Sequence, residues 1–317
     1  MPQQPFIEVQ HVNKTFGKHV VLEDVNLQVP YGEIFGIIGQ SGSGKSTLLN
    51  LLIGFMKPTQ GQILFQSRDI FHDLKNVKQQ FGFTAQEGSF YPQLTVKENL
   101  EYFGALYNVP PHELEVKIPS MLKYFSLEEA ENILGSKLSI GMQKRLDIAC
   151  GLIHEPKVLI LDEPTENLDP ALRKEILNLL KRINKQGVTI IMTSHLLDEV
   201  EAVCEFIAIL HKKRIIKQGT VDDLKDRYSK NQEIHLETVS GNYAKIIKEL
   251  KERKNVEKII SKGHKIIIYT AEAEAELRYI LGLLTELKEK LMDVDVNKPS
   301  LSEVFESVTA NENPATG

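Results

Sequence analysis

The sequence predicts an α/β fold built on a parallel sheet and followed by a small α+β domain. Three short, mostly apolar segments at residues 34–38, 158–161 and 188–192 have the composition of strands buried on both faces of a sheet. Between the last two segments apolar residues recur at helical spacing, and a strand, a helix and a strand in this order form a parallel pair. After Gly219 the composition changes to Lys and Glu alternating with Ile and Leu, which indicates a second domain.

The length and composition are those of a globular protein of about two domains, with 317 residues, 42% of them hydrophobic and 26% charged. A net charge of -5 gives no support to nucleic-acid binding, so no nucleic acid is expected as a partner. No apolar run approaches the roughly 18 residues of a membrane span, and residues 1–8 lack an export signal. Cys150 and Cys204 lie in separate apolar segments and are expected to be reduced thiols. These features favour the cytoplasm.

The first domain is predicted to span residues 1–225 and to contain a helical insertion at about 89–154. The insertion has few β-branched runs and several prolines, a pattern that favours helices separated by turns. A further helix is expected to end before Gly187, because glycine is favoured just after a helix. The predicted strands are 6–9, 20–29 and 34–38, the prolines are Pro92, Pro110, Pro111 and Pro119, and the apolar residues of the further helix are Leu172, Ile176, Leu179, Leu180 and Ile183.

The second domain, residues 226–317, is predicted to have the element order βαββαβ of a ferredoxin-like fold. A linker is expected at 225–232, and Lys262 and Gly263 are expected in a turn between two strands. The predicted elements are a strand at 233–239, a helix at 243–251, the two strands about the turn, a helix at 273–290, a strand at 293–296 and a closing helix within 299–305 that a serine caps.

A phosphate-binding loop follows the strand at 34–38. Its pattern, GxxxxGK[ST], lets closely spaced glycines bring backbone N–H groups onto phosphate oxygens at the start of a helix. The loop therefore indicates a nucleoside triphosphate. Lys45 is expected to reach the β and γ phosphates and Ser46 to bind Mg2+, and an ordinary Gly/Ser turn is the alternative. The loop residues are Gly39, Gln40, Ser41, Gly42, Ser43, Gly44, Lys45, Ser46 and Thr47.

Two acids, Asp162 and Glu163, follow the apolar strand at 158–161. Hydrolysis of a γ-phosphate needs a further Mg2+ ligand and a group that activates water. Asp162 is the candidate for the Mg2+ shell, and Glu163 is the candidate general base for the attacking water. Paired acids at a strand end can also be merely solvated, and this reading is the alternative.

With these two segments and four further motifs, residues 5–225 resemble the ATP-binding subunits of ATP-binding-cassette (ABC) transporters. The motifs stand in the order that the family has. They are Gln86 in the place of the Q-loop glutamine, Ser139 and Gly141 in that of the LSGGQ signature, Asp169 in that of the D-loop and His195 in that of the switch histidine. In addition, Phe16 stands where the family places an aromatic ring on adenine. Taken singly, three of the residues have simpler readings: Phe16 as a core side chain, Gln86 as a loop amide and His195 as a helix cap.

The resemblance implies a P-loop NTPase fold of the ABC type that binds and hydrolyses ATP with Mg2+. It implies that Gln86 senses Mg2+ and the attacking water and that His195 contacts the γ-phosphate. It also implies that Ser139 and Gly141 complete the ATP site of a second subunit. Each ATP site would then belong to a homodimer, or to a pseudo-dimer with a related ATPase.

The partner that the resemblance implies is a separate permease in the membrane, with this chain peripheral on the cytoplasmic face. Contact with the permease is expected near Phe90, Tyr91 and Leu94, on the helical insertion. The segment 299–305 and the Leu-Ser-x-Gly-Met form of the signature are similar to exporter-type subunits related to daunorubicin-resistance and sodium-efflux ATPases, which implies export. The cargo cannot be read from this chain, because specificity lies in the membrane subunit.

The chain departs from the family pattern at two motifs. Ile140 stands in place of the first signature glycine and Met142 in place of its glutamine, but Ser139 can still cap the following helix. Asn167 stands where the family has glycine before Leu-Asp, and asparagine tolerates a left-handed backbone better than other side chains. Neither change removes a catalytic group.

Two other functions remain open from sequence. One is a soluble ABC-type ATPase in translation or DNA repair, although translation-type members carry two cassettes and repair-type members insert a long coiled coil. Here one cassette is present, and 117 residues without heptads separate Lys45 from Asp162 (162 minus 45). The other is a weak ATPase that residues 226–317 regulate or help to dimerise.

Overall fold

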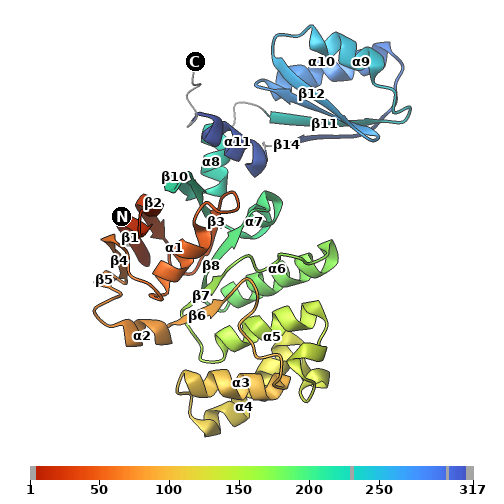
Figure 1. Cartoon of the computed structure of the whole chain (residues 1–317). Helices are drawn as coiled ribbons and strands as arrows, with labels where there is room; N and C mark the ends of the chain where they lie inside the picture. The colour runs from red at the N-terminus through yellow and green to blue at the C-terminus, as the bar shows by residue number, and fades with distance from the viewer. Residues whose placement is uncertain (1–4, 229–231, 298–299, 312–317) are drawn as a thin grey trace. The chain divides into compact units, whose positions relative to one another are not determined.

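The computed structural model describes residues 5–228, 232–297 and 300–311. The chain divides after Thr220 into two compact units, 1–220 and 221–317, each considered by itself (Figure 1). Among the described helices, none is long and apolar enough to cross a bilayer.

The first unit is organised around a six-stranded sheet in the order β10-β9-β3-β8-β7-β6. The four pairs that join β9, β3, β8, β7 and β6 are all parallel, which confirms the predicted parallel sheet. Because β3, β8 and β7 are neighbours, the segments that leave their carboxyl ends meet at one edge of the sheet. The strands are β3 (Ile34–Ile38), β6 (Phe81–Thr84), β7 (Val158–Leu161), β8 (Thr189–Ser194), β9 (Phe206–His211) and β10 (Arg214–Thr220).

A second, antiparallel sheet comes mainly from the N-terminal residues, in the order β2-β1-β4-β5. Helix α1 (Lys45–Leu52) shares one apolar core with both sheets, in which Leu22, Ile37 and Leu49 are fully buried. The predicted strands at 6–9 and 20–29 are present and longer than predicted. The strands are β1 (Ile7–Phe16), β2 (His19–Val29), β4 (Gln60–Phe65) and β5 (Arg68–Asp69).

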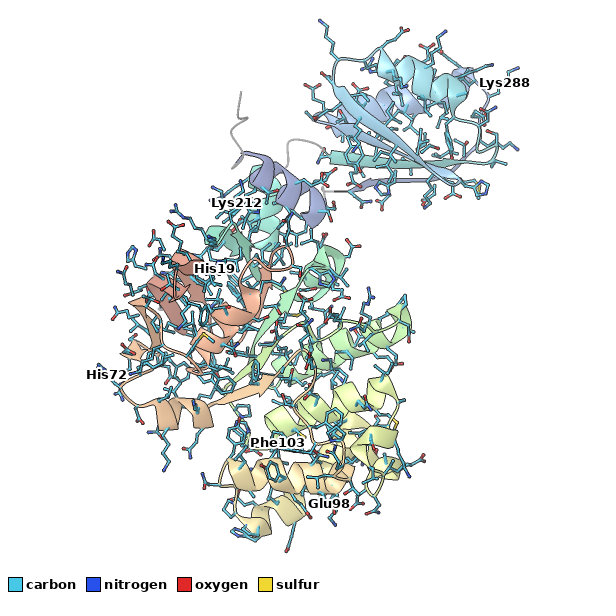
Figure 2. All side chains as sticks on the ribbon, viewed as in Figure 1. His19, His72, Glu98, Phe103, Lys212 and Lys288 are labelled. Atoms are coloured by element: carbon cyan, nitrogen blue, oxygen red, sulfur yellow. The ribbon has the colours of Figure 1, made fainter. Side chains whose placement is uncertain are left out.

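The predicted helical insertion is present between β6 and β7. Thr95 and Glu98 form a capping box at the start of α3, where Glu98 is visible in Figure 2. Pro119 lies inside α4, so the prediction that it separates elements was wrong: the buried face that α4 presents outweighs one lost backbone hydrogen bond. The helices are α3 (Val96–Leu106), α4 (Pro111–Phe125) and α5 (Ile140–Leu152), and α5 packs against β6 and α6.

Three more helices connect the strands of the first unit. The helix predicted before Gly187 is α6; it ends at Asn184, and Gly187 has φ +92°. The helices are α2 (Leu74–Gln79), α6 (Pro170–Asn184) and α7 (Leu197–Val203).

The second unit contains the predicted order βαββαβ in a four-stranded antiparallel sheet, β12-β13-β11-β14. Helices α9 and α10 lie on one face of this sheet (Figure 1) and close an apolar core around Ile246, Ile268 and Ile280. The elements are β11 (Gln232–Thr238), α9 (Ala244–Lys251), β12 (Val256–Lys262), β13 (Lys265–Thr270), α10 (Ala273–Glu286), β14 (Leu291–Asn297) and α11 (Leu301–Asn311).

The linker predicted at 225–232 is wrong at its start, where residues 221–228 form helix α8 (Val221–Tyr228). Acids in its first turn and bases in its last complement the helix dipole, and Val221 and Leu224 are buried. Residues 229–231 of that prediction, and Pro299 of the predicted closing helix, lie outside the described residues.

A half-buried histidine, His154, makes stability depend on pH. The ring of His154 stacks on Tyr107 with centroids 3.6 Å apart, and its Nε2 donates to the carbonyl O of Phe81 at 3.2 Å. Burial lowers the pKa of His154 from 6.5 to about 4. The unfolded chain therefore binds a proton at this site at a higher pH than the folded chain does.

We predict that protonation of His154 lowers the free energy of unfolding as the pH falls from about 6.5 to about 4. The decrease should reach up to about 1.4 kcal/mol per pH unit. Denaturant unfolding at several pH values measures it. In His154→Gln the free energy of unfolding should fall less steeply over this window. A matched control is His72→Gln at an exposed site (Figure 2); equal slopes for both variants would contradict the prediction.

Candidate active site

A cavity of about 540 Å³ lies at the sheet edge where the segments after β3, β7 and β8 meet. Its wall combines the phosphate-binding loop with polar groups from those segments. The lining residues are His19, Val21, Ser41, Gly42, Gly44, Lys45, Ser46, Thr47, Gln86, Glu163, Glu166 and His195.

The loop before α1 has a backbone that only glycine allows. Gly42 has φ +76° and Gly44 has φ +108°, values that L side chains rarely adopt. A Cβ on Gly39 would lie 2.4 Å from the carbonyl O of Leu210. Helix α1 begins without a side-chain cap or an acid in its first turn, so its first N–H groups face the cavity without a partner from the helix.

Two further observations fit this loop to an anion. The Oγ of Ser43 is buried and makes no hydrogen bond within the described residues. The ammonium of Lys45, only 6% exposed, is held 2.9 Å from the carbonyl O of Gly39 and 3.3 Å from that of Gln40. A buried cation among unpartnered N–H groups is the environment in which phosphate oxygens bind.

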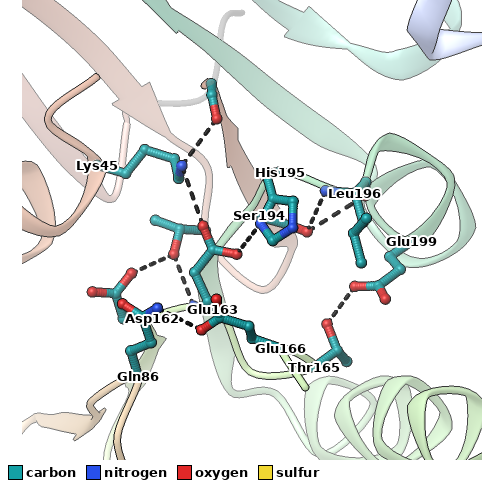
Figure 3. Close-up of polar contacts among 12 residues, drawn as sticks. Lys45, Gln86, Asp162, Glu163, Thr165, Glu166, Ser194, His195, Leu196 and Glu199 are labelled. Atoms are coloured by element: carbon teal, nitrogen blue, oxygen red, sulfur yellow. Dashed lines mark hydrogen bonds and ion pairs between the residues drawn. The ribbon is translucent and has the colours of Figure 1, made fainter. Parts of the chain in front are cut away.

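Glu163 contacts both a cation and a histidine. Its Oε1 is 3.2 Å from Lys45 Nζ, and its Oε2 is 2.6 Å from His195 Nδ1 (Figure 3). The residue has φ +48°, a left-handed backbone that is strained for a glutamate. Asp162 and Glu163 are 6% and 9% exposed, so the alternative that this pair is merely solvated is wrong.

Thr193, which sequence analysis did not identify, fixes both acids. Its hydroxyl donates to Asp162 Oδ1 at 2.6 Å and accepts the backbone N–H of Glu163 at 2.9 Å. The cause is the pairing of β7 with β8, which sets Leu161 opposite Met192 and thus brings the next residue of each strand together.

Two more acids beside the cavity were missed from sequence. Glu166 accepts a hydrogen bond from Gln86 Nε2 and lines the cavity. Glu199 accepts from Thr165 Oγ1 and lies 3.1 Å from Arg173 Nε (Figure 3 shows the Thr165 contact). Burial raises the pKa of Glu199, against the hydrogen bond from Thr165 and the charge of Arg173. These contacts tie the segment after Glu163 to the neighbouring helices.

Several residues predicted for the site do not line this cavity. Phe16 is 48% exposed at the end of β1, with Lys14 Nζ 4.9 Å from its ring centroid; its strand partner His19 does line the cavity. Asp162, Gly39, Gln40 and Ser43 are not among the lining residues either.

The remaining residues predicted from the signature and the D-loop lie at the starts of helices α5 and α6, and two of them, Ser139 and Asp169, cap these helices. Ser139 is exposed and accepts the N–H of Met142 at 3.3 Å, as predicted for an N-cap. Asp169 is exposed and caps α6 through the N–H groups of Ala171 and Leu172. Gly141 packs against Leu172, where a Cβ would be 2.8 Å from its side chain. Asn167 has φ +61°, so the turn before Asp169 has the left-handed backbone that asparagine tolerates.

Comparison with known proteins matches this arrangement to one family. The family model described as "ABC transporter" matches residues 22–166. The chain is 31% identical over 305 residues to the linearmycin resistance ATP-binding protein LnrL of Bacillus subtilis strain 168, covering 96% of this chain and 98% of that protein. It is 35% identical over 232 residues to the probable multidrug ABC transporter ATP-binding protein YbhF of Escherichia coli K12, but spans only 40% of that relative's length.

Solved structures agree with these relatives. The cbiO1 subunit of a Clostridium perfringens ABC transporter complex superposes with a TM-score of 0.65 at 30% identity, covering 71% of this chain and 92% of that one. The ATP-binding cassette MJ0796, a dimer in a post-hydrolysis state with ADP and Pi, superposes with a TM-score of 0.61 at 29% identity, covering 68% and 98%.

Replacing Lys45 tests the anion site directly. Lys45→Ala removes the buried cation and should weaken binding of a fluorescent ATP analogue by about tenfold or more, because a charge-assisted contact to phosphate contributes about 1.5–3 kcal/mol. Fluorescence titration measures the dissociation constant. Lys181→Ala, at an exposed position of α6, should bind the analogue as the unmodified chain does. Equal affinity of the Lys45 variant would remove this loop from the phosphate site.

Proposed function

The chain belongs to the family of ABC transporter ATP-binding subunits, and from this premise we propose that it hydrolyses ATP to drive export through a separate membrane permease. The observation that carries the proposal is the contact of Glu163 with both Lys45 and His195 at the phosphate-binding loop. The names of relatives support the direction, since a multidrug transporter protein and Nod factor export proteins are among them.

In this proposal the phosphates of ATP occupy the loop from Gly39 to Thr47. The N–H groups at the start of α1 would bind phosphate oxygens. Lys45 would leave its ion pair with Glu163 and contact the β and γ phosphates instead. The adenine would lie beyond His19, toward the exposed ring of Phe16.

Mg2+ fits the oxygen groups that remain available. Gln86 uses its amide nitrogen for Glu166, which leaves its carbonyl oxygen, and Asp162 uses Oδ1 for Thr193, which leaves Oδ2. With the Ser46 hydroxyl these are the hard oxygen ligands that Mg2+ prefers. Bound there, the ion would neutralise charge that develops on the phosphates.

Glu163 is proposed as the general base. Its carboxylate would take a proton from water as the water oxygen bonds to the γ-phosphorus and the bond from phosphorus to the leaving ADP oxygen breaks. His195 orients this carboxylate through the 2.6 Å contact, and Thr193 fixes the backbone that carries it. His195 would also contact the γ-phosphate.

A second copy, or a related ATPase, is proposed to complete the site. Ser139 lies outside the cavity on an exposed turn, and Ile140 beside it is 61% exposed. We propose that Ser139, Gly141 and Asp169 reach the ATP held by a second subunit. The dimeric form of the similar cassette MJ0796 supports this.

The permease is proposed to bind the surface expected from sequence together with an apolar groove that helix α3 also lines. Phe90 and Leu94 are half-buried, whereas Tyr91 is 45% exposed and packs edge-on against Tyr102, which is 43% exposed. The groove has a volume of about 360 Å³ and is lined by Phe55 and Leu106, which are 59% and 60% exposed, and by Lys75 and Lys78. This groove suits a short permease helix with apolar and acidic side chains, which would place the chain on the cytoplasmic face of the membrane.

The role of Glu163 is tested by Glu163→Gln. The glutamine keeps the size of the side chain but cannot take a proton, so turnover should fall by about 10²- to 10⁴-fold. ATP affinity should be unchanged or higher, because Lys45 no longer pairs with a carboxylate. Phosphate release and nucleotide binding measure the two quantities.

Glu205→Gln, at an exposed position before β9, is the matched control and should hydrolyse ATP at the ordinary rate. A Glu163→Gln protein that also turns over at that rate would exclude Glu163 as the base.

A further inference from the structure

The turn that carries Gln86 is closed by its own hydrogen bonds. The N–H of Gly88 donates to the carbonyl O of Ala85 at 3.0 Å, and the N–H of Ala85 donates to Ser89 Oγ at 3.1 Å. Gly88 has φ +89°, which a glycine allows without strain. Gln86 is exposed at the top of this turn, so its position depends on what holds the turn.

Asp147, a buried acid on α5, contacts this turn through a hydrogen bond. Asp147 is 1% exposed, and its Oδ1 accepts the N–H of Ser89 at 2.6 Å. The backbone N–H of Phe90 also stabilises this carboxylate. The second oxygen, Oδ2, is buried and makes no hydrogen bond within the described residues. A carboxylate is costly to bury, and the contact it makes here is with the segment that follows Gln86.

The same face of α5 carries a cation, Lys144, on which the charges of this acid and of two acids of the site act. Lys144, one turn before Asp147, is half-buried, and burial lowers its pKa. The charges of Asp147, Glu166 and Asp162 act on it, in that order of strength. Glu166 in turn accepts from Gln86 Nε2. Gln86 is therefore held twice, through its side chain by Glu166 and through its turn by Asp147.

We propose that Asp147 is a positioning residue for ATP hydrolysis, which holds the turn carrying Gln86 against α5. Helix α5 begins at Ile140, directly after its N-cap Ser139. The contact between Asp147 and Ser89, here called the clamp, therefore connects the turn of Gln86 to the helix proposed to reach the second subunit's ATP. A movement of α5 on dimer closure is then transmitted to Gln86. This inference rests on the proposed role of Gln86 at the phosphates.

A double-mutant cycle tests the clamp in the full chain. Asp147→Ala should lower the kcat of ATP hydrolysis by about tenfold, the scale of a misplaced catalytic group, and leave the affinity for the fluorescent ATP analogue within about twofold. Asp147→Asn keeps an oxygen that accepts from Ser89 and should retain kcat within about threefold. In a Gln86→Ala background, Asp147→Ala should lower kcat no further, because the group it positions is gone.

Three results would overturn the inference. In the first, Asp147→Ala lowers kcat by the same factor in the Gln86→Ala protein as in the unmodified chain. This would show that Asp147 does not act through Gln86. Asp147→Asn as slow as Asp147→Ala would show that the accepting oxygen is not what matters. Gln86→Ala that hydrolyses ATP at the ordinary rate would overturn the proposed role of Gln86, and with it this inference; the first two results leave that role standing.

A milder variant covers the case in which Asp147→Ala does not fold. Ser89→Ala removes only the hydroxyl that closes the turn at Ala85, and Ser89 is half-buried rather than in the core. It should lower kcat several-fold with ATP affinity unchanged. The variant keeps the backbone N–H that Asp147 accepts and loosens only the turn itself. A kcat equal to that of the unmodified chain would show that the position of this turn does not govern hydrolysis, which would overturn the inference.

Discussion

The buried ion pair between Lys45 and Glu163 is the interaction on which the rest of the site depends. Both side chains are almost inaccessible to water, and removing two charges from water costs several kcal/mol per ion unless each is well partnered. The carbonyl groups of Gly39 and Gln40 stabilise the cation, and His195 stabilises the anion. The parallel order of β3, β8 and β7 makes this possible, since it brings three segments distant in the sequence to one edge.

The same pair explains how nucleotide can prepare its own hydrolysis. In the proposed mechanism a phosphate group at the loop would compete with Glu163 for Lys45, so that binding would release the carboxylate next to the γ-phosphate. Thr193 then keeps the backbone of Glu163 in place. The strained backbone of Glu163 at φ +48° is maintained by these contacts. In this mechanism, binding of the nucleotide would therefore also activate Glu163 as the base.

Much of the fold and of the site could be predicted from sequence, because the signals are local. The phosphate-binding loop is one continuous segment, and Asn167 sits where the backbone has to be left-handed. Three polar residues of the site were missed for a physical reason: Thr193, Glu166 and Asp147 are ordinary polar residues at ordinary positions. Only strand pairing and helix packing bring them to their partners. Pro119 was misjudged because its local preference gave way to the apolar face of α4.

The central claim is that the cavity is half of a site, in which ATP held by Lys45 also binds Ser139 of a second subunit. Light scattering of the Glu163→Gln protein with ATP and Mg2+ tests it most directly. The expected result is a particle of twice the 35.9 kDa of the chain. When Ser139→Glu is combined with Glu163→Gln, the new negative charge would face the phosphates, and only a monomer is expected. A monomer at saturating ATP, or a dimer that Ser139→Glu leaves intact, would contradict the account.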